Sequence, residues 1–120
     1  MATSGEDITV PVIVAAQLLQ EGYKYLDVRT KEEFLQGHVE GALNIPFMFK
    51  EGTGMVKNTN FVDEVSKKLN KDENVVVGCQ SGRRSLMAVN ELIAEGYKGV
   101  KDMGGGIAAW IQSGYQTCIA

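Results

Sequence analysis

The segment CQSGRR, residues 79–84, combines residue types that together can activate a thiol. It follows an apolar run, residues 75–77, and a helical pattern begins after it. A short loop of glycine and small polar residues between a strand and a helix can turn its backbone N–H groups inward. These dipoles and the positive end of the helix favour an anion at their centre. We therefore expect Cys79 to be a nucleophilic thiolate, with Arg83 and Arg84 adding positive charge nearby.

The length of this loop separates two kinds of chemistry. A cysteine phosphatase needs its arginine one residue further from the cysteine, so that the loop encircles a phosphate. Here that position is Ser85, and Arg84 comes one residue earlier. A shorter loop fits a smaller group, a single sulfur atom carried on the cysteine as a persulfide. The spacing favours sulfur transfer over the main alternative, a phosphatase or arsenate reductase.

Composition limits the remaining function classes. The chain has 120 residues, of which 44% are hydrophobic and 22% are charged, as in an ordinary globular domain. Its net charge of −3 argues against a general nucleic-acid binder, which needs clustered lysine and arginine. No apolar run approaches the ~18 residues of a membrane-spanning helix. We expect a cytoplasmic protein as given, or a chloroplast protein if a transit peptide has been removed.

Strand-like and helix-like segments alternate along the chain. Short β-type runs are predicted at residues 8–10, 25–28, 42–45, 75–77 and 100–103. Helical patterns fall between them, including one that Thr30 and Glu33 begin as a capping box and one that Asn58 or Thr59 begins. Residues 49–57 are predicted to form a loop. This order predicts an α/β domain with a mainly parallel sheet of about five strands and helices on both faces. We expect a flexible segment over 1–7, the domain over 8–115 and a tail over 116–120.

Several motifs of the chain resemble the rhodanese (thiosulfate sulfurtransferase) family. They are YLDVR at 25–29, GHVEGALNIP at 37–46, the loop at 79–85, and DMGGG at 102–106 before Trp110. The likeness covers nearly the whole chain and is strongest to the small single-domain sulfurtransferases of plants. The resemblance implies the rhodanese fold and a sulfurtransferase activity.

The resemblance also implies a mechanism and its participants. Cys79 would take the outer sulfur of thiosulfate or another donor and pass it to an acceptor in a ping-pong cycle. The backbone amides of the loop residues Gln80, Ser81, Gly82, Arg83, Arg84 and Ser85 would hold the persulfide anion. Cyanide, glutathione, thioredoxin and glutaredoxin are the implied acceptors. No metal or organic cofactor is implied, and we expect a monomer or weak dimer.

Two positions depart from the family pattern. Larger two-domain rhodaneses carry a basic residue where this chain has Glu33, and Ser81 stands where they have a lysine. Both departures argue against efficient use of thiosulfate and leave room for another donor. Asp27 and Arg29 have two interpretations, an aspartate that positions an active-site arginine or an ion pair at the surface.

The remaining candidate residues have mostly structural interpretations. His38 is better explained by structural hydrogen bonding than as the base of a Cys–His pair. Gly104–Gly106 fits close backbone packing beside the loop, and Trp110 fits the core. Cys118 is expected in a loose tail, where it could resolve a persulfide or form a disulfide. A non-enzymatic binding module is the second alternative, although the intact loop around Cys79 argues against it.

Overall fold

A five-stranded parallel sheet runs through the computed structural model, which describes residues 8–119. The predicted flexible segment 1–7 lies outside the described residues. The strands stand in the order β1-β7-β6-β2-β3. They are β1 (Thr9–Val10), β2 (Lys24–Asp27), β3 (Leu43–Asn44), β6 (Asn74–Gly78) and β7 (Gly99–Met103). The predicted parallel α/β sheet is confirmed.

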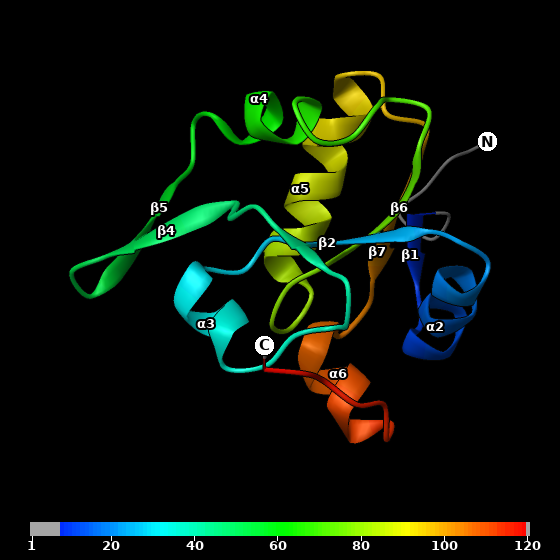
Figure 1. Ribbon diagram of the computed structural model, residues 1–120. Coiled ribbons are helices and arrows are strands. Elements are labelled where there is room, and N and C mark those ends of the chain that lie inside the picture. The colour runs from blue at the N-terminus through cyan, green and yellow to red at the C-terminus, as the bar shows by residue number, and fades with distance from the viewer. Residues whose placement is uncertain (1–7, 120) are drawn as a thin grey trace.

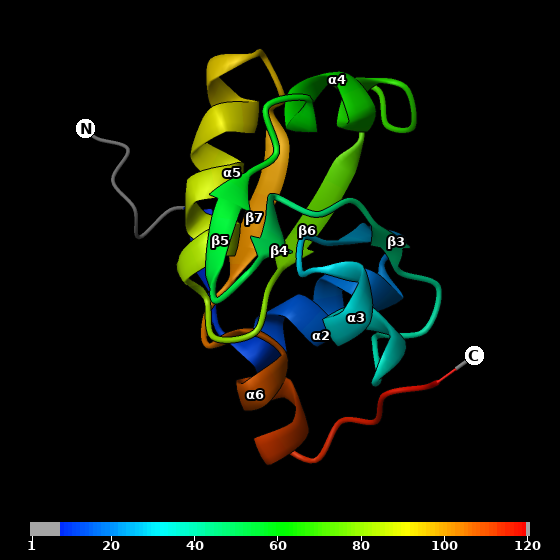
Figure 2. The same cartoon turned by 90° about the vertical axis from the view of Figure 1, so that its left-hand side faces the viewer.

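Helices cover both faces of this sheet, as predicted. One face packs against α4 (Phe61–Ser66) and α5 (Arg83–Ala94), and the other against α2 (Val12–Gln20) and α6 (Gly106–Gln112), as can be followed in Figure 2. The short helix α3 (Lys31–Leu35) follows β2. Within residues 8–119, no helix combines the length and the apolar character that a membrane span requires.

Strand β6 has the central place because its side chains are apolar on both faces. Val75 and Val77 are buried in the core cluster beneath α4 and α5, while Val76 is buried in the cluster beneath α2 and α6. A continuous apolar run is typical of a parallel strand that is covered on both sides. The carboxyl end of β6 therefore lies at the middle of the sheet edge, between the ends of β2 and β7.

The helix starts agree with the sequence to different degrees. Thr30 and Glu33 form the predicted capping box at the start of α3. The predicted start of α4 is wrong by one or two residues, because its N-cap is Asn60. Asn58 instead accepts a hydrogen bond from the Asn60 N–H through its side-chain oxygen, 3.0 Å away, and so supports the turn before the helix.

The prediction of a loop at residues 49–57 is wrong. Antiparallel strands β4 (Met48–Glu51) and β5 (Gly54–Lys57) form a hairpin there, which Figure 1 shows apart from the main sheet. Gly52 occupies the tight turn with φ +61°. The sequence of β5 carries no strand signal, because this strand is exposed along its length and its two apolar residues, Met55 and Val56, are adjacent rather than alternating.

The end of the described chain makes hydrogen bonds to the rest of the domain. The backbone of Cys118 exchanges two hydrogen bonds with His38, N–H to carbonyl, at 2.9 and 2.8 Å. The Trp110 indole N–H donates to the Gln116 carbonyl oxygen at 2.9 Å. These contacts attach residues 116–118 to α6 and to the segment after α3.

Candidate active site

Three polar residues meet where the central strands end. Asp27 ends β2, Cys79 follows directly after β6, and Asp102 lies near the end of β7. The strand register aligns them, since Asp27 pairs with Gly78 and Val77 pairs with Asp102. In parallel sheets this edge is where ligands bind. The predicted location of Cys79 at such an edge is confirmed.

The loop after β6 folds around the Cys79 sulfur. The Gly82 N–H donates to Sγ at 3.0 Å, and the Ser85 hydroxyl oxygen lies 3.4 Å from the same sulfur. Gly82 has φ +110°, a conformation that turns the chain directly into α5. Cys79 is only 1% exposed. The loop thus encloses the sulfur beside the first turn of a twelve-residue helix, where a negative charge is favoured.

Helix α6 fixes the outer side of this loop. The N–H groups of Ile107 and Ala108 donate to the carbonyl oxygens of Cys79 and Gln80, at 2.8 and 3.1 Å. Gly106 makes this approach possible, because a Cβ atom there would lie 2.4 Å from the Cys79 oxygen. Close packing beside the loop, predicted for the glycine run, is confirmed.

Asp27 and Arg29 form a buried ion pair, so the alternative of a surface pair is wrong. The guanidinium donates from Nε and Nη2 to the carboxylate, with distances of 2.8 to 3.1 Å. Nη2 also donates to the Gly37 carbonyl oxygen at 2.7 Å. The other terminal nitrogen lies 3.5 Å from the Gln80 side-chain oxygen, which links the pair to the loop.

Arg84 has a partner that the sequence did not reveal. Its two terminal nitrogens donate to the two carboxylate oxygens of Glu33, at 2.8 and 3.0 Å. Burial opposes the charge on Glu33, but the hydrogen bonds from Arg84 and Thr30 outweigh it and hold the pKa of this carboxyl at about 2. Glu33 therefore compensates much of the positive charge that Arg84 was expected to offer an anion.

The other loop residues differ in exposure. Gln80, Ser81 and Arg83 are exposed, whereas Ser85 is fully buried on the inner side of α5. Arg83 is thus the loop arginine whose side chain lies open to solvent. The structure brings the predicted loop residues together around Cys79, with Asp27 and Arg29 beside them.

Asp102 is the site residue that sequence reasoning missed. One carboxylate oxygen accepts a hydrogen bond from the Ser85 hydroxyl, and the other accepts one from the Thr9 hydroxyl at 2.9 Å. Burial raises the pKa of Asp102, and these two hydrogen bonds offset part of that rise. The available signal was the position of Asp102 at a strand end, two residues before the glycine run.

His38 has the structural role that the sequence favoured. Its Nδ1 lies 3.0 Å from the Phe34 carbonyl oxygen, and its ring stacks on Phe34 with centroids 3.9 Å apart.

Cys79 and Cys118 are both free thiols. Between Ile8 and Ile119, no three or more His, Cys, Asp or Glu side chains gather as a metal site would require.

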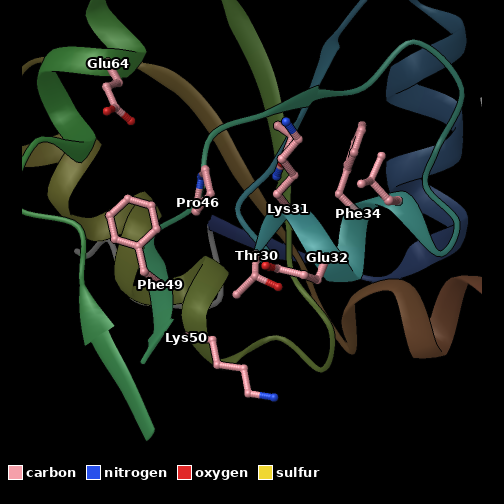
Figure 3. A pocket seen from close by; sticks show the side chains of 10 residues that line it. Thr30, Lys31, Glu32, Phe34, Pro46, Phe49, Lys50 and Glu64 are labelled. Carbon is pink, nitrogen blue, oxygen red and sulfur yellow. The ribbon is translucent and has the colours of Figure 1, made fainter. Parts of the chain in front are cut away.

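A pocket lies beside α3, and Cys79 is not among the residues that line it. Its volume is about 590 Å³, and Figure 3 shows Phe34 and Phe49 among the side chains that line it. Two lysines and two glutamates also line the pocket: Lys31, Lys50, Glu32 and Glu64. The mixed charges give this pocket no preference for an anionic or a cationic ligand.

Comparisons with known proteins agree with this geometry. A family model described as a rhodanese-like domain matches residues 12–113. Thiosulfate sulfurtransferase 16, chloroplastic, from Arabidopsis thaliana is 49% identical over 109 residues, covering 91% of each chain. Thiosulfate:glutathione sulfurtransferase from Homo sapiens is 33% identical over 107 residues, covering 87% of this chain and 93% of that protein. The rhodanese-like domain of the Alr3790 protein from Anabaena sp. superposes with a TM-score of 0.75 and 28% identity, covering 92% of this chain and 80% of the other. The chain belongs to the rhodanese family.

Proposed function

We propose that this protein is a sulfurtransferase that moves a sulfane sulfur from thiosulfate or another donor to cyanide or a thiol, through a persulfide on Cys79. Membership of the rhodanese family supports the sulfurtransferase activity. The observation that carries the proposed mechanism is the Cys79 sulfur, held 3.0 Å from the Gly82 N–H beside the start of α5. A backbone donor and a helix N-terminus both favour a thiolate there.

The first half of the proposed cycle loads the enzyme. The Cys79 thiolate attacks the outer sulfur of thiosulfate, the bond between the two donor sulfurs breaks, and sulfite leaves with the bonding electron pair. The new terminal sulfur carries the negative charge of the persulfide. The Gly82 amide, which already donates to Sγ, would stabilise this charge, and we propose that other amides of the loop join it.

The second half returns the enzyme to its starting state. An acceptor attacks the terminal sulfur, the sulfur–sulfur bond of the persulfide breaks, and Cys79 leaves as a thiolate. Cyanide becomes thiocyanate in this step, and a thiol becomes a persulfide. Glutathione is a reasonable acceptor because a relative bears the name thiosulfate:glutathione sulfurtransferase. Thioredoxin and glutaredoxin remain proposed protein acceptors, with the protein acting as a monomer or weak dimer.

The contact between Glu33 and Arg84 bears on the choice of donor. Thiosulfate carries two negative charges, and a carboxylate already occupies both terminal nitrogens of Arg84. Attraction of an anionic donor then depends more on Arg83, which is exposed. This arrangement supports a donor with less charge than thiosulfate as the better substrate.

The name of a relative also bears on where in the cell the protein acts. One relative at 49% identity bears the name thiosulfate sulfurtransferase 16, chloroplastic. We propose the chloroplast as one location of this protein, with the cytoplasm as the alternative. Localisation of the full-length protein fused to a fluorescent reporter in plant cells would distinguish the two.

Peptide mass spectrometry tests the proposed cycle directly. The protein is incubated with thiosulfate, or with a low-molecular-weight persulfide, and then with glutathione. We expect one added sulfur on the Cys79 peptide and its removal by glutathione. Cys79→Ser should prevent the addition without unfolding the protein, while Cys118→Ser, the matched control, should leave it unchanged. Sulfur transfer that persists in Cys79→Ser would refute the mechanism, and failure of every donor to load Cys79 would favour a binding module.

A further inference from the structure

A continuous chain of hydrogen-bonding groups leads away from the Cys79 sulfur into the protein. Sγ lies 3.4 Å from the Ser85 hydroxyl oxygen, and the Ser85 hydroxyl in turn donates a hydrogen bond to Oδ1 of Asp102. Oδ2 of the same carboxylate accepts from Thr9 on β1. Cys79, Ser85 and Asp102 are each at most 2% exposed. The thiol is therefore connected to a buried carboxylate through one hydroxyl group.

The Ser85 hydroxyl has one proton and two possible acceptors. The Gly82 carbonyl oxygen lies 3.1 Å away, and the Asp102 carboxylate lies closer. Hydrogen bonds to a charged acceptor are the stronger ones, so the proton of Ser85 belongs on the Asp102 side. The lone pairs of the Ser85 oxygen then face Cys79 and can accept the proton of its S–H group.

We propose that Asp102 receives the proton of the Cys79 thiol through Ser85. The S–H bond breaks as that proton bonds to the Ser85 oxygen, and the former hydroxyl proton of Ser85 moves to Oδ1 of Asp102. Negative charge passes from Asp102 to the sulfur, where the Gly82 N–H and the new Ser85 O–H both donate to it. The net charge of the three groups does not change. Asp102 acts through Ser85 and is a positioning residue.

The surroundings of Asp102 suit it to hold a proton. Burial favours its neutral form, although Ser85 and Thr9 stabilise the charged form. Tyr25 on β2 interacts electrostatically with both Asp102 and Cys79, but burial raises the pKa of this phenol and keeps it protonated. His38, the single histidine of the chain, is bonded to a backbone carbonyl oxygen. Asp102 is thus the proton acceptor that the hydrogen-bond chain reaches.

The proposed transfer has a distinctive dependence on pH. Thiol with carboxylate and thiolate with carboxylic acid contain the same number of protons, so the ratio between these two forms is independent of pH. Alkylation of Cys79 by neutral iodoacetamide should therefore level off at a plateau as the pH falls, until solvent protonates Asp102. Without an internal acceptor, the thiolate fraction falls about tenfold for each pH unit below the pKa of a thiol.

The experiment compares full-length variants in a Cys118→Ser background, with alkylation of Cys79 followed by mass spectrometry. Asp102→Asn should abolish the plateau, and Ser85→Ala, which keeps the carboxylate but interrupts the chain, should do the same. Thr9→Val is the matched control, because it removes a hydrogen bond to Asp102 and leaves the path to Ser85 intact. Its plateau should be as high as that of the wild type or higher. Circular dichroism checks that each variant is folded.

Several results would overturn the inference. They are a wild type without a plateau, a plateau that persists in Asp102→Asn or Ser85→Ala, and a loss in Thr9→Val equal to that in Asp102→Asn, which would indicate a packing role. The inference rests on the proposed role of Cys79, but alkylation needs no sulfur donor. Failure of the wild type to take up sulfur would therefore refute the proposed function while the pH profiles still decide the role of Asp102.

Discussion

Gly106 offers a sharp test of how α6 supports the active-site loop. Replacement by alanine has two separate consequences. The residue has φ +61°, and a side chain in this left-handed region costs roughly 1–2 kcal/mol. In addition, the new Cβ would lie 2.4 Å from the Cys79 oxygen and 2.6 Å from the Gln80 carbonyl carbon, so the loop or the helix must move.

The size of the second effect follows from the contacts that such a movement breaks. Two hydrogen bonds join α6 to the loop, from Ile107 and Ala108, and each is worth about 0.5–1.5 kcal/mol. We expect Gly106→Ala to lower the free energy of unfolding by about 2–5 kcal/mol in total. Sulfur loading of Cys79 should also slow, because a reacting group displaced by about 1 Å can lose roughly 100-fold in rate.

Gly52 supplies the matched control, since it has the same φ of +61° and no atom within 4 Å of its added Cβ. Gly52→Ala should cost only the conformational part, roughly 1–2 kcal/mol, and should leave sulfur loading unchanged. Urea unfolding measures the stabilities, and peptide mass spectrometry after brief exposure to a sulfur donor measures the loading. Equal losses of stability in the two variants, with unchanged loading in Gly106→Ala, would refute the reasoning.

Three further substitutions probe the ion pair and the core. Glu33→Gln should lower the free energy of unfolding at neutral pH, because the ionised Glu33 carboxyl stabilises the wild type. This contribution is present above the ordinary carboxyl pKa of 4.5 and is lost as the pH falls from there toward about 2. Free energies of unfolding measured across this range should therefore differ between the two proteins above the window and converge below it. Arg84→Ala leaves the Glu33 carboxylate without its cation, so loading by anionic donors should weaken more than loading by neutral ones. KM values for one donor of each kind would show this, and equal changes would contradict it. Tyr25→Phe should raise the free energy of urea unfolding by about 1–3 kcal/mol, because the buried hydroxyl has no hydrogen-bond partner in residues 8–119 and such a group is costly. A less stable Tyr25→Phe protein would show that the hydroxyl has an internal partner.

The sequence predicts those parts of the protein that depend on local signals. The capping box is predictable because Thr30 and Glu33 lie three residues apart. The apolar run of β6 is predictable because the strand is buried on both faces and needs no particular partner. The loop around Cys79 is predictable because the residues that form it are neighbours in the sequence. Its position at the sheet edge follows from the alternation of strands and helices.

Contacts between distant segments are what the sequence could not supply. Glu33 and Arg84 are 51 residues apart, and either could have faced solvent. Asp102 reaches Ser85 from another strand, and nothing in its neighbours indicates which face of β7 it occupies. The hairpin of β4 and β5 was missed because both of its strands are largely exposed, which leaves no apolar alternation to detect.

The strand order has a consequence for how the protein is made. Strand β1, near the start of the chain, pairs with β7, and Thr9 reaches Asp102 across 93 residues. A ribosome synthesises Cys79 before it synthesises β7 and α6, so the emerging thiol at first lacks both Asp102 and the amides that fix its loop. Domains generally fold as units, and a ribosome adds about 5–20 residues per second. A nascent chain therefore exposes its cysteine for a second or more before the groups that enclose it emerge.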